Sequence, residues 1–306
     1  MANEITYTDQ GALFIAAALN QMLHENIVDR TDLLSTCKDF GSINGAGSQA
    51  YKVAKASFDD AMSAANADEV TAVANTDLST GFATITVARQ ALRRTVSDLY
   101  SLAGGPRPGL ERFAQDMADA AILRQTDMIC ALYGGLSESV GSVGALTVDD
   151  IYDAQYQLIQ ARVPGPYVCV LSPKQLTEFM DGLRGEGGAV QFESATAAML
   201  GAAGAGLAGT WHGIQFWSSD SVVNNSGQLE GAMYGEGCFG FARGVPSDVV
   251  GLAGPGSFAS VTPNGSPIFV EFERKAGEAH TLVVGNLYFG ISEIEDARGV
   301  LISTGA

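Results

Sequence analysis

The chain contains 306 residues, of which 46% are hydrophobic, and it carries a formal net charge of -17 at pH 7. This length and composition allow a substantial buried core, in one large or two interleaved domains, and exclude a disordered chain. The acidic balance excludes a general nucleic-acid-binding surface, because such a surface needs clustered Lys and Arg to displace counterions from phosphates.

The cysteines and the N-terminus favour synthesis in a cytoplasm. The four cysteines are spread widely, and Cys130 and Cys169 lie in apolar patterns where a cysteine acts as a small hydrophobic side chain. The first residues lack the basic segment, apolar core and cleavage site of a secretion signal. Residues 194–219 contain no charged side chain, but Ala, Gly, Ser and Thr dominate them, so we expect no membrane helix there.

The N-terminal third is predicted to contain a helical arm and a long hairpin. Apolar residues at helical spacing predict an amphipathic helix over 12–28 that packs against another surface. Two extended arms follow a Gly- and Ser-rich stretch, the outgoing arm from Tyr51 and the returning arm over 82–96, with a polar tip between them. Because isolated two-stranded ribbons are marginally stable in water, we expect this hairpin to pack against a neighbour.

Opposite charges on the hairpin suggest a contact between subunits. The tip carries acidic side chains, Asp59 and Asp60 among them, and no Lys or Arg, whereas the returning arm carries Arg89, Arg93 and Arg94. Arginines in a strand flanked by apolar residues pair with carboxylates more often than with phosphates, and the tip supplies carboxylates in the same molecule or in another copy. We therefore hypothesise that these five residues take part in an intersubunit contact; a phosphate contact is the alternative.

Residues 109–133 are predicted to form the longest helix of the protein. A break at Gly104-Gly-Pro-Arg-Pro108 precedes it, and a pair of glycines ends it. At 1.5 Å per residue, a helix of about 25 residues spans about 37 Å, the length of a structural spine. Ile122, Leu123 and Ile129 extend its apolar surface beyond one stripe, so we expect other layers to cover it on more than one side.

Residues 147–185 are predicted to form a helix, a strand and a second helix. Thr147 is the expected cap of the first helix, with Asp150 at the third helical position, and a Pro-Gly-Pro run ends that helix. Residues 167–171 form a short apolar strand between breakers. Ser172-Pro173-x-Gln175 then supplies a cap, a first-turn proline and a capping glutamine for the second helix.

The rest of the chain is predicted to be rich in loops and then in strands. Residues 186–265 contain many Gly, Ser and Asn residues. Alternating or continuous apolar runs predict strands at 214–217, 238–242, 268–272, 281–291 and 300–303. Strands and helices are segregated along the chain, which indicates an α+β fold rather than a repeating βαβ architecture.

A glycine motif at Gly204-Ala-Gly206-Leu-Ala-Gly209 matches the dinucleotide-binding fingerprint but stands in the wrong context. That fingerprint needs a strand before it and a helix N-terminus after it, whereas here a helix-prone segment precedes and a strand-like segment follows. We therefore interpret it as a loop or helix end built from small residues.

The remaining polar residues do not support catalysis, a cofactor or a metal ion. The histidines are His24, His212 and His280. None of them has a second histidine or a cysteine at the spacing typical of metal ligands. Asp149-Asp150 is explained as the acidic first turn of a helix, and Glu293-x-Glu295-Asp296 as a solvated turn. We expect a protein that is not an enzyme.

The order of these elements resembles that of the major capsid proteins of tailed bacteriophages. The passages that carry the resemblance are FATITVARQALRRTVSDLY with the spine helix LERFAQDMADAAILRQTDMICALYGGL, then LTVDDIYDAQYQLIQARVPGPYVCVLSPKQLTEF, and then GTWHGIQFWSSDSV. These are patterns of spacing rather than fixed signatures, and their ordered combination covers nearly the whole chain.

The resemblance implies an α+β subunit with four parts. Residues 1–40 would be an N-terminal arm that reaches along a neighbour, and residues 41–103 an extended loop over the adjacent subunit. Residues 104–165 and 262–306 would form a peripheral domain around the spine helix. Residues 166–261 would form an axial domain near the centre of each hexamer or pentamer.

The same resemblance implies the function and the partners. The chain would self-assemble into the hexamers and pentamers of an icosahedral phage head, enclosing double-stranded DNA without sequence-specific binding. A portal and separate scaffolding or decoration proteins would be its partners, and it would reside in the virion after assembly in the bacterial cytoplasm, without a membrane. The alternatives are an encapsulin-like compartment and a soluble α+β enzyme with a nucleotide loop over 201–209.

Overall fold

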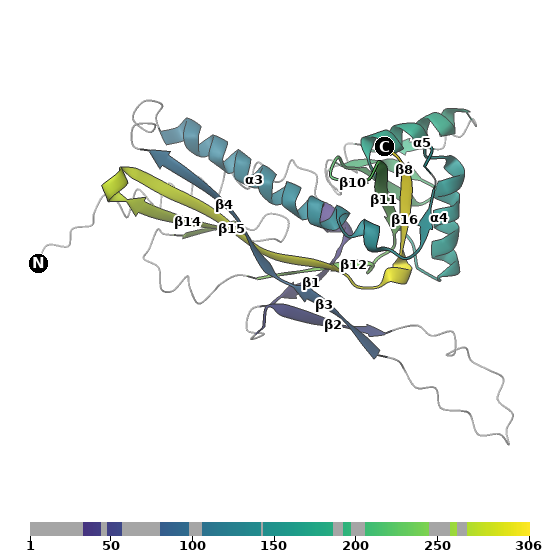
Figure 1. Ribbon diagram of the computed structural model, residues 1–306, viewed down its shortest axis with the longest axis horizontal. Helices are drawn as coiled ribbons and strands as arrows, with labels where there is room; N and C mark the ends of the chain where they lie inside the picture. The colour runs from purple at the N-terminus through teal and green to yellow at the C-terminus, as the bar shows by residue number, and fades with distance from the viewer. Residues whose placement is uncertain are drawn as a thin grey trace, which may run out of the picture.

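A computed structural model describes most of the chain. The residues it describes are 33–43, 48–56, 80–97, 106–141, 143–185, 192–196, 206–244, 258–261 and 268–306. They form two sheets, a separate two-stranded ribbon and three α-helices (Figure 1). The predicted helix over 12–28 lies outside the described residues.

A six-stranded sheet is built around the longest strand, β15 (His280–Glu293). Its other members are β1 (Lys38–Ser42), β4 (Ala88–Ser97), β12 (Phe239–Arg243), β13 (Phe258–Val261) and β14 (Ile268–Lys275). Strand β15 pairs along its length with β4 on one side, and with β14 and then β12 on the other. The predicted strands near 268–272 and 281–291 are confirmed, and both are longer than expected.

The predicted spine helix is α3 (Pro106–Cys130), which lies along one face of this sheet (Figure 1). Ile129 and Cys130 are fully buried, and Ile122 is 9% exposed, so the helix is covered on more than one side as expected. Leu123 contradicts that expectation, because its side chain is 53% exposed. The core beside α3 contains side chains from both sheets, so the helix joins them.

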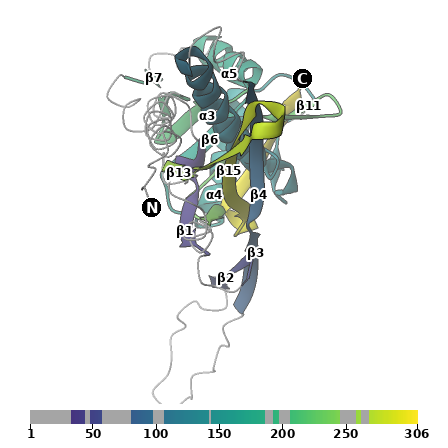
Figure 2. The same ribbon diagram turned by 90° about the vertical axis from the view of Figure 1, so that its left-hand side faces the viewer.

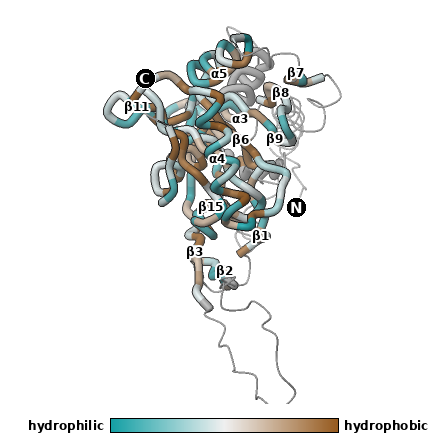
Figure 3. The backbone as a smooth tube through the Cα atoms, turned by 90° about the vertical axis from the view of Figure 1, so that its right-hand side faces the viewer, coloured by the Kyte–Doolittle hydropathy of each residue, from teal (hydrophilic) through white to brown (hydrophobic). Residues whose placement is uncertain are grey.

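An eight-stranded sheet forms the other end of the molecule. Its order is β5-β16-β11-β6-β9-β8-β7, with β10 paired to β11. The strands are β5 (Ser139–Val140), β6 (Tyr167–Leu171), β7 (Glu193–Ser194), β8 (Leu207–Trp211), β9 (Ile214–Ser218), β10 (Val223–Asn225), β11 (Gln228–Tyr234) and β16 (Gly299–Gly305). Helices α4 (Val148–Gln160) and α5 (Pro173–Gly185) pack on one face of it (Figure 3).

Both predicted helix caps of this part are present. Thr147 Oγ1 accepts a hydrogen bond from the backbone N–H of Asp150 at 3.2 Å, and the Asp150 carboxylate accepts one from the Thr147 N–H at 2.9 Å. Ser172 and Gln175 make the same reciprocal pair at 3.1 and 3.0 Å. These caps satisfy N–H groups that have no partner within the helix, so local sequence alone sets where α4 and α5 begin.

The predicted hairpin is shorter than the sequence pattern suggests. Strands β2 (Ala50–Ala56) and β3 (Thr80–Thr86) pair with each other and form a ribbon that projects from the body (Figures 1 and 2). The second half of the returning arm is strand β4, which pairs with β15 over ten residues instead. Val87 separates the two strands and donates its N–H to Gln49 O at 2.9 Å.

Short 3₁₀ helices occupy four connections in the described ranges. They are η1 (Leu33–Thr36), η3 (Tyr133–Gly135), η6 (Ala276–Glu278) and η7 (Asp296–Arg298). Helix η3 begins three residues after α3 ends, so Tyr133, the last residue of the predicted spine helix, lies in a 3₁₀ turn. No helix in the described ranges has the length and apolar character needed to cross a membrane.

Candidate interaction surfaces

One face of the β2–β3 ribbon is bound to the body and the other is open. Val53 on β2 and Ala83 and Ile85 on β3 are buried. They belong to a cluster with Ala242 of β12 and Ile294, the residue after β15. On the opposite face, Phe82 is 66% exposed. The ribbon therefore packs against its own subunit at the base and presents a large apolar side chain outward.

A glycine makes the close approach at the base of the ribbon possible. A Cβ atom added to Gly290 on β15 would lie 2.2 Å from Thr86 O and 3.0 Å from Val87 Cα, both backbone atoms. Gly in a strand often marks such an approach of two backbones. The sequence signal for this contact is the glycine itself, which stands inside the predicted strand 281–291.

The first described segment, residues 33–43, is anchored in the core. Leu33 and Leu34 of η1 are 0% and 2% exposed, and Thr36 Oγ1 lies 2.7 Å from Tyr234 OH, within hydrogen-bond distance. Strand β1 then pairs in parallel with β12, and Arg243 Nη2 donates to Asp39 Oδ2 at 2.6 Å. The start of the described chain is therefore held at two places.

The strand register separates the three arginines proposed for an intersubunit contact. Arg89 pairs with Tyr288 and Arg93 with Val284, so both lie on one face of β4, whereas Arg94 pairs with Val283 on the face toward α3. Arg89 Nε donates to Asn286 Oδ1 at 2.7 Å, so its side chain is engaged within the same chain. The two remaining members of the hypothesis, Asp59 and Asp60, lie outside the described residues.

Arg89 and Arg93 line an open groove of about 470 Å³ on the face of the sheet that α3 does not cover. Glu273 from β14 and apolar side chains of β4 and β15 complete its lining. Arg93 is exposed there. Arg89 is also an exposed residue. A groove lined by two arginines and one carboxylate fits a polar segment of another protein chain better than it fits a small apolar ligand.

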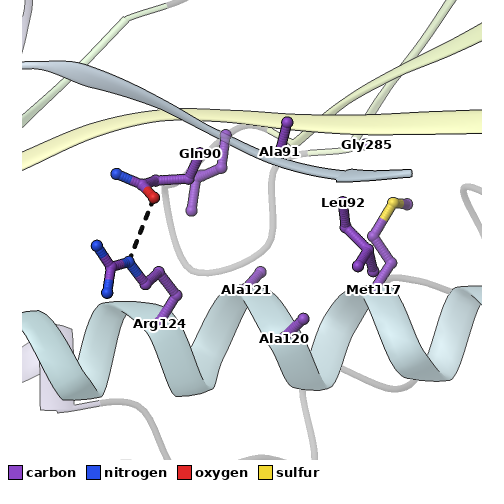
Figure 4. A pocket seen from close by; sticks show the side chains of 9 residues that line it. Gln90, Ala91, Leu92, Met117, Ala120, Ala121, Arg124 and Gly285 are labelled. Atoms are coloured by element: carbon purple, nitrogen blue, oxygen red, sulfur yellow. Dashed lines mark hydrogen bonds between the residues drawn. The ribbon is translucent and has the colours of Figure 1, made fainter.

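A small pocket of about 220 Å³ lies where α3 crosses β4 and β15, and Figure 4 shows the side chains that line it. At one end Arg124 Nε donates to Gln90 Oε1 at 3.2 Å; at the other, Met117 lies over Gly285 (Figure 4). Between these two ends, the small side chains of Ala120 and Ala121 do not fill the gap between the helix and the sheet. The pocket results from small residues at a helix–sheet contact and contains no group suited to chemistry.

The carboxylates at the end of β15 are more than the solvated turn that we predicted. Asp296 Oδ1 accepts the N–H of Ser137 at 2.9 Å, and Glu295 forms an ion pair with Arg298 Nε. Burial, followed by the charge of Asp296, raises the pKa of the Glu293 carboxyl. These contacts connect η7 to the segment after α3, so the cluster has a structural role.

The other groups considered for chemistry have structural surroundings. His212 occupies the tight turn between β8 and β9 with φ of 50°, and His280 begins β15, with its Nε2 3.4 Å from Glu278 Oε2. In the G-x-G-x-x-G motif, Gly206 directly precedes β8 and Gly209 lies within it. A strand therefore follows where the dinucleotide-binding fingerprint needs a helix. The described residues contain no group of three or more His, Cys, Asp or Glu arranged to hold a metal ion.

The buried thiols and phenols are held in their neutral forms. Burial raises the pKa of the Cys130 thiol to about 12, and it raises the pKa of Cys169 and Cys238 as well. Burial also raises the pKa of Tyr133 and Tyr234. Because the thiolate is the reactive form of cysteine, these three side chains act as small hydrophobic groups, as the sequence pattern predicted for Cys130 and Cys169.

Comparison with solved structures identifies the fold. The capsid of the cyanophage P-SCSP1u is similar with a TM-score of 0.56 and 13% identity, over 90% of this chain and 87% of that chain. The mature capsid of bacteriophage PhiM1 has a TM-score of 0.60 and 7% identity, over 90% and 87%. A holo-encapsulin complex from Synechococcus elongatus has a TM-score of 0.60 and 14% identity, over 88% and 85%.

No protein-family model matches the sequence, and no curated protein matches it. The structural likeness nevertheless extends over most of this chain and of each similar chain. The chain therefore has the α+β fold of tailed-phage capsid proteins, and the resemblance inferred from the order of elements is confirmed at the level of the fold. An encapsulin shares that fold.

Proposed function

We propose that this protein is the major capsid protein of a tailed bacteriophage and assembles into the hexamers and pentamers of an icosahedral head. The observation that carries the proposal is the likeness of nearly the whole chain to subunits of assembled shells, including the capsids of P-SCSP1u and PhiM1. The projecting ribbon supports it, because the face that does not pack on its own subunit presents Phe82, which is 66% exposed, to a neighbour.

The parts of the fold suggest how a subunit divides its contacts. In this proposal residues 1–40 and 41–103 reach to neighbours, residues 104–165 and 262–306 form the peripheral domain, and residues 166–261 form the axial domain. The six-stranded sheet with α3 belongs mainly to the peripheral part, although β1, β4, β12 and β13 come from other segments. The axial part corresponds to most of the eight-stranded sheet and to α5.

The charge of the chain fits a shell that encloses DNA without binding it. A net charge of -17 leaves few cations to fix phosphates, so packaged DNA would stay mobile. In this proposal the further partners are a portal and separate scaffolding or decoration proteins, with assembly in the host cytoplasm. The chain is proposed to act by its shape, without a catalytic step.

An encapsulin-like compartment is the second candidate, because the encapsulin match has a TM-score of 0.60. Both candidates predict closed particles, and they differ in what the particles enclose. Head particles purified from an infected host would contain double-stranded DNA, whereas a compartment would contain a cargo protein and no genome.

Electron microscopy of the purified chain tests whether it forms closed particles, which both candidate functions predict. We expect rings or closed shells in negative stain after assembly is promoted by high protein concentration or by crowding agents. Sedimentation would then place most of the protein in particles far larger than 31.8 kDa. A monomer under every such condition, with saturable nucleotide binding, would instead support the soluble enzyme alternative.

Reversing the charge of Arg93 tests the proposed intersubunit contact. We expect Arg93→Glu to reduce particle yield severalfold at low salt, because the carboxylate would repel the acidic tip of a neighbour. Adding Asp59→Lys and Asp60→Lys should restore the yield. Arg184→Glu is the matched control, since the Arg184 side chain is 71% exposed on α5. If the Arg93→Glu variant assembles as well as the parent chain, Arg93 does not take part in the intersubunit contact.

A further inference from the structure

Helix α4 exposes a second apolar surface beside the one that it buries. Its buried residues are Val148, Ile151, Ala154 and Leu158. Tyr152, Tyr156 and Ile159 are nevertheless 43%, 63% and 57% exposed. Residues three and four positions apart are neighbours on a helix surface, so these three side chains form one continuous stripe. We call it the α4 stripe.

The α4 stripe is unusual for the described part of this chain. Six large hydrophobic side chains there are exposed, and three of them lie on this one helix of 13 residues. Single exposed apolar residues are ordinary in soluble proteins, whereas a contiguous group rimmed by polar residues marks an interaction site. Tyrosine is also enriched at the centres of protein–protein interfaces.

The stripe is held in place by the sheet beneath it. The Tyr152 ring lies 5.1 Å from the ring of Trp211 and 6.0 Å from that of His212, measured between centroids. Trp211 is itself 3% exposed and packs against Phe179 of α5. The turn between β8 and β9 thus supports one end of the stripe, which reduces the entropy lost when a partner binds.

The second half of α4 can be approached by another acidic chain, whereas Asp149, Asp150 and Asp153 give the first half a negative charge. Residues 154–161, which include two of the three stripe residues, carry no charged side chain in a chain with a net charge of -17. Two acidic chains repel each other on average, so close contact between copies is favoured where opposite charges pair or where charge is absent. The uncharged half of α4 is such a place.

The size of the stripe excludes it as the sole contact of a stable pair. Aromatic side chains bury about 150–250 Å² each, so three partly exposed residues offer about 300 Å², well below the ~800 Å² per partner of a stable two-protein interface. Such a contact becomes effective when other contacts hold the same partners together, as in a closed ring of identical subunits.

We propose that the α4 stripe is a contact surface for a second copy of this chain within the assembled shell. The inference rests on the proposed shell function and names a surface that the function requires. Helix α4 forms the outer layer at one end of the molecule, on the right of Figure 1, away from the N-terminal end of α3. The stripe and the β2–β3 ribbon therefore give each subunit two separated contact regions.

Charge introduced on the stripe tests the proposal. Tyr156→Glu and Ile159→Glu should each lower the fraction of subunits in particles about tenfold or more, while circular dichroism and the thermal midpoint of the unassembled subunit stay unchanged. Leu123→Glu is the matched control, because Leu123 is 53% exposed on α3. It should assemble as the parent chain does. Normal assembly of both stripe variants would overturn the proposal.

A photo-crosslinker provides a direct readout that does not depend on loss of assembly. With p-benzoyl-phenylalanine in place of Tyr156, irradiated particles should yield covalent dimers, and mass spectrometry should identify both crosslinked peptides as this chain. Irradiated particles without such dimers would overturn the inference even if all charged variants fail to assemble. If the parent chain forms no particles at all, the proposed function fails first.

Discussion

Replacing Gly290 with alanine is expected to separate the base of the β2–β3 ribbon from the six-stranded sheet. The added Cβ would lie 2.2 Å from Thr86 O and 3.0 Å from Val87 Cα. Neither atom belongs to a flexible side chain, so the backbone of the ribbon or of β15 has to move. Overpacking of this kind costs about 3 kcal/mol of the free energy of unfolding.

The displacement would also affect the buried face of the ribbon. Ile85 is 0% exposed and Val53 is 9% exposed in the cluster beneath it, and both would gain contact with water if the ribbon tilts outward. We therefore expect faster hydrogen exchange of the β2 and β3 amides and loss of particle formation, because the ribbon would no longer project at the required angle. Denaturant unfolding of the unassembled subunit measures the energetic part.

Gly277→Ala is the matched control for Gly290→Ala. A Cβ at Gly277 would have no atom within 4 Å, so the stability of this variant should stay within about 0.5 kcal/mol of the parent. If Gly290→Ala unfolds at the same denaturant concentration as the control, the backbone contact at Thr86 does not hold the ribbon.

The second large effect is expected from Gln175, a fully buried residue in the first turn of α5. Its Oε1 accepts the N–H of Ser172 at 3.0 Å, and its Nε2 donates to Thr304 Oγ1 at 2.9 Å. The same Nε2 lies 3.1 Å from Leu229 O and 3.3 Å from Ile302 O. One amide thus caps a helix and connects it to β11 and β16.

Gln175→Ala should destabilise the subunit by about 3–4 kcal/mol. The variant leaves a cavity and several buried polar groups without their partner, and each unsatisfied group costs about 1–3 kcal/mol. Urea unfolding followed by tryptophan fluorescence measures the loss, since Trp217 lies 1% exposed in the core. Gln160→Ala, at an exposed position of α4, should change stability by less than about 0.5 kcal/mol.

Gln175→Glu tests separately the two roles of the side chain: the bond that its Oε1 accepts at the helix cap, and the bonds that its Nε2 donates to β11 and β16. The carboxylate can still accept the Ser172 N–H, but it faces two carbonyl oxygens and a hydroxyl in a buried site. Burial raises the pKa of such a carboxyl, so the folded state binds its proton more tightly than the unfolded state does. The loss of unfolding free energy in Gln175→Glu, relative to the parent chain at the same pH, should therefore become smaller as the pH falls from 7 toward 4.5. An equal loss at pH 7 and pH 4.5 would show that the donated bonds do not matter.

Features set by neighbours in sequence were predictable. The caps at Thr147 and Ser172 depend on contacts within a few residues, and the structure contains both of them. The predicted spine helix and the predicted strand near 268–272 are also present, as α3 and β14. Strand β11 was missed because Glu230 and Gly231 interrupt its apolar pattern. It is buried between β16 and β6, where pairing overrides the weak preference of its residues.

The candidate surfaces were predictable only in part. The arginines of the returning arm were identified from charge, yet one arm turned out to be two strands with different partners. The register against β15 then put Arg89 and Arg93 on one face and Arg94 on the other. Tyr156 and Ile159 belong to a helix that the sequence predicted, but their exposure depends on which layers cover α4.

The amino-acid sequence by itself determined the positions of the main helices and several strands, the acidic charge of the subunit, and the order of elements that resembles a capsid protein. These follow from local capping, periodicity and composition. The tertiary structure decided which strands pair, why Gly290 has no side chain, and which apolar residues stay exposed. These depend on contacts between distant residues, such as Thr36 with Tyr234, 198 positions apart, and no local pattern records them.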